Sequence, residues 1–415
     1  MKRVTLICLN DLRGGAAVVT YRLMGALCSM GVDARMVVVH KESNNPRVDS
    51  VGDGWRTKAA FMAEHADIYL HNGRRRDDVF KVSTGRFGVG VDRHPWVADA
   101  DAVILNWVNQ GMMSLDCIGR ICSRGIPVVW TMHDMWNMTG VCHHAGSCAR
   151  YRAGSHCGSC PQLNSDSDND LSTRVQQAKA RLYEGNGRNI KFVAVSNWLA
   201  DCARHSSLMQ RADIEVIPNA FPVQDFMPQP RLSRAAMHLP PGKLIVMGAA
   251  RLDDPIKNLP LAVETLNLVA ENDAQAHAVF FGDLRDPRAL ESLRMPHTWL
   301  GKIGDRTSLA SLYAHAHAVL STSHYETLPG TLIEGISAGA MAVTTGHGGQ
   351  ADIVSDGTTG YICGDSATEL ADALTRVLAT DTDRDTLHSA MARRFNSTEI
   401  ARRYLRLMFG DKFLS

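Results

Sequence analysis

Two acidic residues in the second half of the chain, Glu326 and Glu334, have the type and spacing of a binding or catalytic pair. They lie in the segment HYETLPGTLIEGISAGAMAVTT, on either side of a Pro-Gly turn that we expect to open a helix. Glu326 would then precede the helix and Glu334 would lie inside it. The first N–H groups of this helix, on Gly330, Thr331 and Leu332, could bind an anion. Because acidic side chains are seldom buried without partners, the pair predicts a site.

Two cations, Arg251 and Lys257, directly follow the apolar run at residues 243–250. Asn258 comes next and is expected to open a helix. Two cations beside a helix N-terminus neutralise a pyrophosphate better than either does alone, so the segment predicts a phosphate site. The alternative interpretation is a pair of solvent-exposed surface charges.

Two loops in the first half of the chain also follow apolar runs. Gly14 and Gly15 would leave backbone N–H groups free at a helix N-terminus, although a structural turn explains them equally well. His133 and Asp134 come directly after the run at residues 127–132, so we expect both side chains to project from the carboxyl end of a strand. The alternative for His133 is an imidazole bound by the local backbone.

Four cysteines crowd into a short Gly-rich segment, together with three histidines. The C-x-x-C spacing of the second pair is typical of zinc ligands, whereas the first pair is more widely spaced. We therefore weigh a structural zinc site against free thiols or a disulfide, for the set Cys142, Cys148, Cys157 and Cys160. The remaining six cysteines are scattered among apolar neighbours, as expected in a reducing compartment.

The composition excludes several classes of protein. With 44 Lys and Arg against 43 Asp and Glu, the chain has no overall field that would attract nucleic acid. No apolar stretch has the length of a transmembrane span, so the cytoplasm is the expected location. The run Arg74–Arg76 is followed by Asp77 and Asp78, which favours a solvated loop over its alternative, a lipid-binding patch.

The elements that position these loops alternate between short apolar runs and helix-period segments in both halves of the chain. This rhythm predicts an α/β protein with two doubly wound, Rossmann-like domains of parallel strands. The rhythm lapses where prolines cluster between Pro218 and Pro230, as in an interdomain connection. We therefore expect a first domain over residues 1–218 and a second over residues 219–395.

Nearly the whole chain resembles the retaining glycosyltransferases of family 4, which have the GT-B fold. The resemblance rests on the order and separation of the motifs described above, together with VSNWLAD around Ser196, IPNAF around Asn219 and GGQADIVSDGTTGYI. It implies that the two domains face a central cleft. It also implies that the last helical stretch, residues 396–415, crosses back onto the first domain.

The resemblance implies a role for each matching residue. Arg251 and Lys257 would hold the diphosphate of a UDP- or GDP-sugar, with the glycine loops and helix N-termini beside it. Glu326 would contact the transferred sugar, Glu334 the ribose, and His133 would face the sugar. No metal ion is needed for catalysis in this group, and the anomeric configuration is retained.

These roles are chemically consistent, because cations stabilise a departing diphosphate and a carboxylate favours an oxocarbenium-like sugar. The alternatives are a nucleotide-sugar epimerase, a phosphorylase or a non-catalytic sugar-nucleotide binding protein of the same fold. Two further segments, NWVNQGMMSL and TMHDMWNMTGVCHHAGSCARYRAGSHCGSCPQL, resemble a subgroup of bacterial capsule, exopolysaccharide and O-antigen assembly. Where that subgroup is expected to have a histidine, this chain has Asn106. The acceptor would be a saccharide or a lipid-linked saccharide, and the protein would be cytoplasmic, with peripheral contact at the inner face of the membrane as an option.

Overall fold

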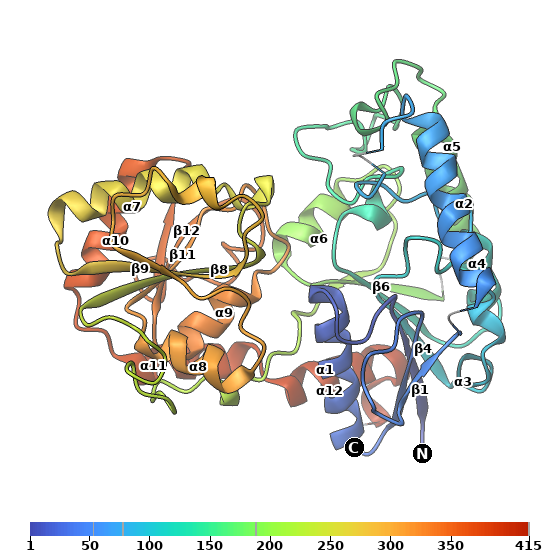
Figure 1. Cartoon of the computed structure of the whole chain (residues 1–415). Helices are drawn as coiled ribbons and strands as arrows, with labels where there is room; N and C mark the ends of the chain where they lie inside the picture. Colours follow the sequence, from blue (N-terminus) through green and yellow to red (C-terminus); the bar gives the residue numbers. More distant parts are fainter. Residues whose placement is uncertain (53, 77–78, 187–188, 414–415) are drawn as a thin grey trace. The chain divides into compact units, whose positions relative to one another are not determined.

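The computed structural model describes residues 1–52, 54–76, 79–186 and 189–413. The chain forms two compact units, one made of Met1–Ala220 with Ser397–Ser415 and the other of Phe221–Asn396. The sequence predicts the first boundary at residue 218 and the return to the first domain at residue 396. Each unit has its own sheet, and each is described by itself below (Figure 1).

The first unit contains a seven-stranded sheet in the order β3-β2-β1-β4-β5-β6-β7, in which every neighbouring pair is parallel. The chain order reverses between β1 and β4, and such a switch point is where open α/β sheets bind ligands. The strands are β1 (Arg3–Ile7), β2 (Asp33–Val38), β3 (Val48–Ser50), β4 (Ala102–Leu105), β5 (Val128–Met132), β6 (Ile190–Ala194) and β7 (Ile214–Val216).

Seven α-helices belong to the first unit as described: α1 (Gly15–Ser29), α2 (Trp55–His71), α3 (Pro95–Ala98), α4 (Leu115–Cys122), α5 (Leu171–Asn186), α6 (Asn197–Arg204) and α12 (Ser397–Phe409). In α1 the stripe Val19, Leu23 and Leu27 is buried, as its helical spacing predicts. The C-terminal helix α12 packs against α1 and joins the same core through Ile400 and Tyr404. The Tyr404 hydroxyl lies 2.9 Å from Thr131 Oγ1, which fixes α12 to the end of β5.

The second unit contains a six-stranded parallel sheet in the order β10-β9-β8-β11-β12-β13. Its strands are β8 (Lys243–Arg251), β9 (Ala276–Asp283), β10 (His297–Trp299), β11 (Ala318–Ser321), β12 (Met341–Thr345) and β13 (Gly360–Cys363). Its helices are α7 (Leu259–Asn272), α8 (Arg306–His315), α9 (Gly330–Ser337), α10 (Ala367–Ala379) and α11 (Arg384–Arg394). The switch point here lies between β8 and β11.

The central strands are buried along their length because helices cover both faces of each sheet. All four residues of β4 and all five of β12 are buried. Among the residues that the structure describes, none of the helices has the length and hydropathy to cross a bilayer. Arg74, Arg75 and Arg76, just after α2, are exposed, whereas Asp77 and Asp78, on which the solvated-loop interpretation depends, lie outside the described residues.

Candidate functional site

Lys257 and Glu326 form an ion pair at the switch point of the second sheet. The Lys257 ammonium donates a hydrogen bond to Glu326 Oε1. Lys257 ends a short 3-10 turn, Pro255–Lys257, that follows β8, and Glu326 lies in the loop after β11. Their side chains are 25% and 20% exposed, so the pair is partly shielded but still open to a ligand.

The loop after β11 holds Glu326 by contacts to its side chain and to its backbone. Ser323 Oγ donates to Glu326 Oε1 at 3.1 Å, and the Gly349 N–H donates to the Glu326 carbonyl at 2.7 Å. Gly348 has φ +100°, and a Cβ on it would lie 2.3 Å from the Glu326 carbonyl oxygen. Gly348 is therefore required for the close approach of these two segments.

Arg251, the last residue of β8, pairs with acidic side chains of its own loop. Its guanidinium lies 2.9 Å from Asp254 and 3.7 Å from Asp253. Asp254 also caps the Pro255–Lys257 turn by accepting the Ile256 N–H at 3.1 Å. A diphosphate at Arg251 would therefore compete with the Asp254 carboxylate for the guanidinium.

The backbone between Lys257 and α7 is fixed from the strand side. Thr322 Oγ1 donates to the carbonyl of Lys257 at 2.9 Å and to that of Asn258 at 3.0 Å. Asn258 has φ 51° and ψ 50° and occupies the N-cap position of α7, although its side chain makes no capping hydrogen bond. Its amide is therefore not used to cap the helix.

Helix α9 begins at Gly330, and Gly330, Thr331 and Leu332 are its first three residues. Their N–H groups have no acceptor within the helix because no helical carbonyl lies four residues before them. Glu334 lies inside α9. Burial, with a smaller contribution from the charge of Glu334, raises the pKa of the Tyr313 hydroxyl. Glu326 lies ahead of the helix, so the two glutamates occupy the positions that their spacing predicts.

Gly14 and Gly15 in the first unit lie where β1 leads into α1. Gly14 is the N-cap residue, with φ 90° and ψ 156°, a backbone conformation that residues other than glycine seldom adopt. Gly15 is the first helical residue. A Cβ on either residue would meet no atom within 4 Å, so the space beside the helix N-terminus is open. Backbone conformation, and not crowding, accounts for the glycine at position 14.

His133 follows β5 and contacts Asn106, which follows β4. Its Nε2 lies 3.0 Å from Asn106 Oδ1, so the imidazole donates through Nε2 when the amide oxygen accepts. Burial lowers the pKa of His133 to about 4, which keeps the ring neutral at pH 7. Both residues line a small cavity of about 10 Å³ with Thr131, Asn219 and Tyr404. Asn106, which departs from the subgroup pattern, is thus the partner of His133.

Asp134 does not project from the strand end beside His133, so that prediction is wrong. Its carboxylate is buried and accepts hydrogen bonds from Trp107 Nε1 at 2.8 Å and from the Trp136 N–H at 2.8 Å. It also lies 2.7 Å from His143 Nδ1. Burial alone would raise the pKa of Asp134, but His143 and these donors lower it. The carboxylate is satisfied inside the unit because the following loop folds back over it.

The four cysteines of the Gly-rich segment line one small cavity of about 20 Å³ in the first unit, together with Ala145 and Tyr151. All four are free thiols, so the disulfide alternative is not formed. Burial raises the pKa of Cys142 to about 12 and that of Cys157 to about 11. Over the described residues, no group of three or more His, Cys, Asp or Glu side chains is arranged to hold a metal ion. Zinc binding by Cys142, Cys148, Cys157 and Cys160 stays a prediction.

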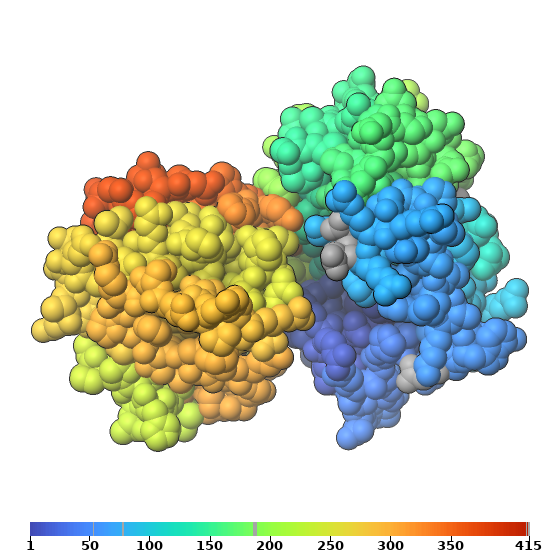
Figure 2. Space-filling model, turned by 45° about the horizontal axis from the view of Figure 1, so that its top comes forward, coloured from blue at the N-terminus to red at the C-terminus, as the bar shows by residue number. Residues whose placement is uncertain are grey.

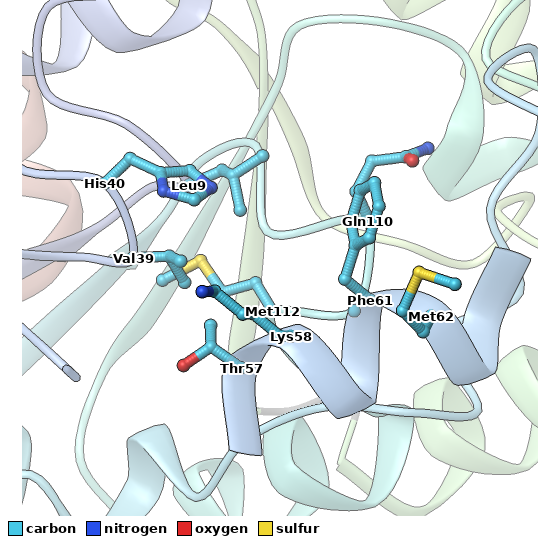
Figure 3. A pocket seen from close by; sticks show the side chains of 10 residues that line it. Leu9, Val39, His40, Thr57, Lys58, Phe61, Met62, Gln110 and Met112 are labelled. Atoms are coloured by element: carbon cyan, nitrogen blue, oxygen red, sulfur yellow. The ribbon is translucent and has the colours of Figure 1, made fainter. Parts of the chain in front are cut away.

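A cavity of about 580 Å³ opens at the carboxyl ends of β1, β2 and β4, at the switch point of the first sheet. His40, Thr57, Lys58 and Gln110 supply polar groups to this cavity, and Phe61 and Met62 supply apolar side chains from α2 (Figure 3). The sequence motifs did not indicate this cavity. Four of its ten lining residues come from α2, whose spacing gives no sign of a ligand.

The structure therefore brings Lys257 and Glu326 together and places Arg251 and the start of α9 in the adjoining loops of the same unit. His133 and the Gly14-Gly15 turn belong to the first unit. Sequence reasoning missed Ser323, Asp253 and Asp254. Their positions directly after β11 and β8 were the available signal.

Comparisons with known proteins agree with this architecture. Residues 243–380 match the family model described as "Glycosyl transferases group 1". No curated protein sequence matches the chain. Similar solved structures include a sucrose-phosphate synthase from Thermosynechococcus elongatus, with 17% identity, full coverage of both chains and a TM-score of 0.67.

A second similar structure is HepE from Anabaena in complex with UDP and glucose, with 15% identity, 98% coverage of this chain, 99% of HepE and a TM-score of 0.63. A third is a glycosyltransferase from Rickettsia africae, with 15% identity, 98% coverage of both chains and a TM-score of 0.66. At these identities the likeness shows the fold. The chain thus has the two Rossmann-like units of the GT-B glycosyltransferase fold, and its residues 243–380 match the glycosyl transferases group 1.

Proposed function

We propose that the protein is a retaining glycosyltransferase that moves a sugar from a UDP- or GDP-sugar to a glycan or lipid-linked glycan in bacterial surface polysaccharide biosynthesis. The observation that carries this proposal is the contact between Lys257 and Glu326 after neighbouring strands. It combines a cation for a diphosphate with a carboxylate for a sugar. A UDP complex of the similar HepE supports a nucleotide donor.

The proposed chemistry follows from the charges that develop during transfer. When the bond from the anomeric carbon to the diphosphate breaks, negative charge grows on the leaving oxygen. Arg251, Lys257 and the N–H groups at the start of α9 would stabilise that charge. The bound diphosphate would draw Lys257 away from Glu326, which leaves the Glu326 carboxylate free to favour the oxocarbenium-like sugar.

The remaining residues have supporting roles in this proposal. Glu334 would bind the ribose of the nucleotide. Asn258, at the beginning of α7, would also bind the donor. The Gly14-Gly15 turn would offer N–H groups to the donor, and neutral His133 would face the sugar, with Nδ1 as an acceptor for a hydroxyl because Nε2 donates to Asn106. Catalysis would need no metal ion, because protein cations neutralise the leaving group, and the protein would act in the cytoplasm.

The test is incubation of the purified protein with UDP- and GDP-sugars, with and without saccharide and lipid-linked acceptors. If the protein is a retaining glycosyltransferase, a glycosylated product should form only when both donor and acceptor are present. NMR of the anomeric proton of this product should show that the configuration of the donor sugar is retained. An epimerised nucleotide sugar formed without acceptor would support the epimerase instead. Nucleotide binding with no turnover of any donor would support a non-catalytic binding protein.

A further inference from the structure

The guanidinium of Arg251 is flanked by two carboxylates of its own loop, and the first of them, Asp253, is fixed by other groups. Its Oδ2 accepts the N–H of Arg285 at 3.1 Å and the N–H of Asp286 at 3.2 Å. Its Oδ1 lies 3.7 Å from Arg251 Nε. Within the described part of the chain neither of these two atoms has a hydrogen-bond partner. Asp253 therefore faces Arg251 without bonding to it directly.

The second carboxylate, Asp254, makes the direct contact. Its Oδ2 lies 2.9 Å from Arg251 Nη2, and its Oδ1 accepts the Ile256 N–H at 3.1 Å. The first contact depends on the negative charge, whereas the second caps the turn Pro255–Lys257, and a neutral amide oxygen can do the same. The side chains of Arg251 and Asp254 are 32% and 33% exposed, so a ligand from solvent can reach both. The turn leads directly into α7, whose yellow residues lie on the surface of the second unit in Figure 2.

The turn that presents Lys257 is also held by contacts in which Asp254 takes no part. The His324 N–H donates to the Ile256 carbonyl at 2.8 Å, and Thr322 Oγ1 donates to the Lys257 carbonyl at 2.9 Å. Loss of the negative charge at Asp254 should therefore leave Lys257 in place. What it changes is the partner of the Arg251 guanidinium.

Carboxylates outnumber cations in these loops. Arg251 and Lys257 face three acids, Asp253, Asp254 and Glu326. Glu326 has a part in the proposed transfer, and Asp253 binds the backbone that follows β9. In the ion pairs of the described residues, the Asp254 carboxylate meets only Arg251. A carboxylate that shares a cation with an anionic ligand opposes the binding of that ligand.

We propose that Asp254 is an internal competitor of the donor diphosphate. Its carboxylate pairs with Arg251 in the free protein, is displaced when the diphosphate binds, and returns to the guanidinium as the nucleotide product leaves. Asp254 thereby lowers the affinity for nucleotide and speeds its release, a step that limits turnover in many enzymes. The inference rests on the proposed function, because it assigns a residue that sets the affinity of the same donor site.

The sign of one substitution separates a competitor from a positioning residue. Asp254→Asn removes the charge and keeps an oxygen for the Ile256 N–H. A competitor predicts that this variant binds UDP or GDP about three- to fivefold more tightly than the parent, as expected for one partly exposed ion pair. A residue that positions Arg251 for the ligand predicts weaker binding instead. Calorimetric titration of the full chain measures the affinity, and displacement of a fluorescent nucleotide should show slower release from the variant.

A double variant tests whether the effect passes through Arg251. In an Arg251→Gln background, Asp254→Asn should gain much less affinity, because the cation that the carboxylate shares with the ligand is already lost. An equal gain in that background would show that Asp254 repels the ligand directly. That result would overturn its assignment as a competitor for Arg251.

Asp383→Asn is the matched control. Asp383 caps α11 by accepting the Thr386 N–H at 3.1 Å, as Asp254 caps its turn. It lies at the amino end of β11, where its neighbour Arg384 donates to the carbonyl of Ala316 at 2.7 Å. This control should bind nucleotide like the parent, and equal melting temperatures would show that all the variants fold.

The outcomes also separate this inference from the proposed function. Parental or weaker affinity of Asp254→Asn, in a protein whose parent binds UDP or GDP, would overturn the inference and leave the proposed transfer intact. If neither the parent nor Asp254→Asn binds UDP or GDP, the inference and the proposed donor are both wrong. Tighter binding by Asp254→Asn in a protein that transfers no sugar would support the competitor and count against the transferase.

Discussion

Lys257 and Glu326, 69 residues apart in the chain, are joined by a direct ion pair. The cation follows β8 and the carboxylate follows β11, and these strands are parallel neighbours. Any ligand that binds one of the two residues must therefore change the surroundings of the other.

Lys257→Ala and Glu326→Gln should each lower transfer about a hundred- to a thousandfold, but in different ways. Lys257→Ala should also weaken UDP or GDP binding, because the diphosphate loses a cation. Glu326→Gln should bind the free nucleotide almost as the parent does, and it fails only in turnover. The double variant should lose less than the product of the two single losses, since the residues act as a unit. Steady-state rates and calorimetric nucleotide titrations measure both effects.

The control for this pair is Glu271→Gln, which breaks the exposed ion pair with Arg294 in the same unit. It should keep parental turnover and nucleotide affinity. Parental turnover of Glu326→Gln with its true donor and acceptor would contradict the proposed site.

Gly348→Ala should disturb Glu326 through the backbone. The added Cβ would meet the Glu326 carbonyl oxygen at 2.3 Å, and φ is +100° at this residue. We expect a loss of about 1–3 kcal/mol in the free energy of unfolding and a marked loss of transfer. Gly357→Ala is the matched control, because its φ is +73° but no atom lies within 4 Å of the new Cβ. Gly357→Ala should lower the free energy of unfolding but keep parental turnover. Equal losses of turnover in the two variants would refute a specific effect of Gly348→Ala on Glu326.

Lys179 should be essential for the stability of the first unit. Its ammonium is buried and donates to the carbonyls of Trp136, Thr139 and Gly140 at 2.5, 3.1 and 2.9 Å. Burial lowers the pKa of Lys179 to about 7, whereas the three acceptors suit the protonated amine. Lys179→Met leaves three carbonyls without their donor, so we expect a loss of about 3–5 kcal/mol in urea unfolding. A loss below about 1 kcal/mol would show that water or a rearranged loop replaces the ammonium.

The free energy of unfolding should fall as the pH drops from about 6.5 to about 4. Burial lowers the pKa of both His133 and His317 from 6.5 to about 4. The unfolded chain therefore binds more protons than the folded chain in this window, and protonation favours unfolding. His133→Gln and His317→Gln should each flatten the dependence between pH 7 and pH 5, whereas His156→Gln, at an exposed position, should not. Parallel curves for the parent and the first two variants would contradict this assignment.

Zinc at the cysteine cavity is tested by elemental analysis of protein purified without chelator. If Cys142, Cys148, Cys157 and Cys160 bind zinc, about one ion per chain should remain after desalting, and its removal should lower the melting temperature. Cys157→Ser should abolish retention, and Cys202→Ser, outside this cluster, should not. Zinc-free protein whose melting temperature is unaffected by chelator or added zinc would show that the four residues serve as buried thiols.

Much of the architecture follows from local sequence. Continuous apolar runs such as AVIL and LIVM must be buried on both faces, and helix-period stripes such as Val19, Leu23 and Leu27 must pack against them. The alternation of the two patterns predicted parallel α/β units. The position of cations and glutamates directly after such runs predicted which loops could bind a ligand.

Only the tertiary structure decided which of these residues are partners. Lys257 lies next to Glu326 because strand order makes β8 and β11 neighbours, and local periodicity carries no information about strand order. Asp134 follows a strand as His133 does, yet it is buried because the loop that follows folds back, so that His143, the Trp136 N–H and Trp107 Nε1 contact its carboxylate. Helix α2 has apolar residues at the spacing of a core face. The acids of this helix, Glu64 and Asp67, nevertheless bind the rest of the unit, whereas Trp55 remains in solvent. Spacing shows that side chains share a face of a helix, and only the packing of the whole unit determines what that face meets.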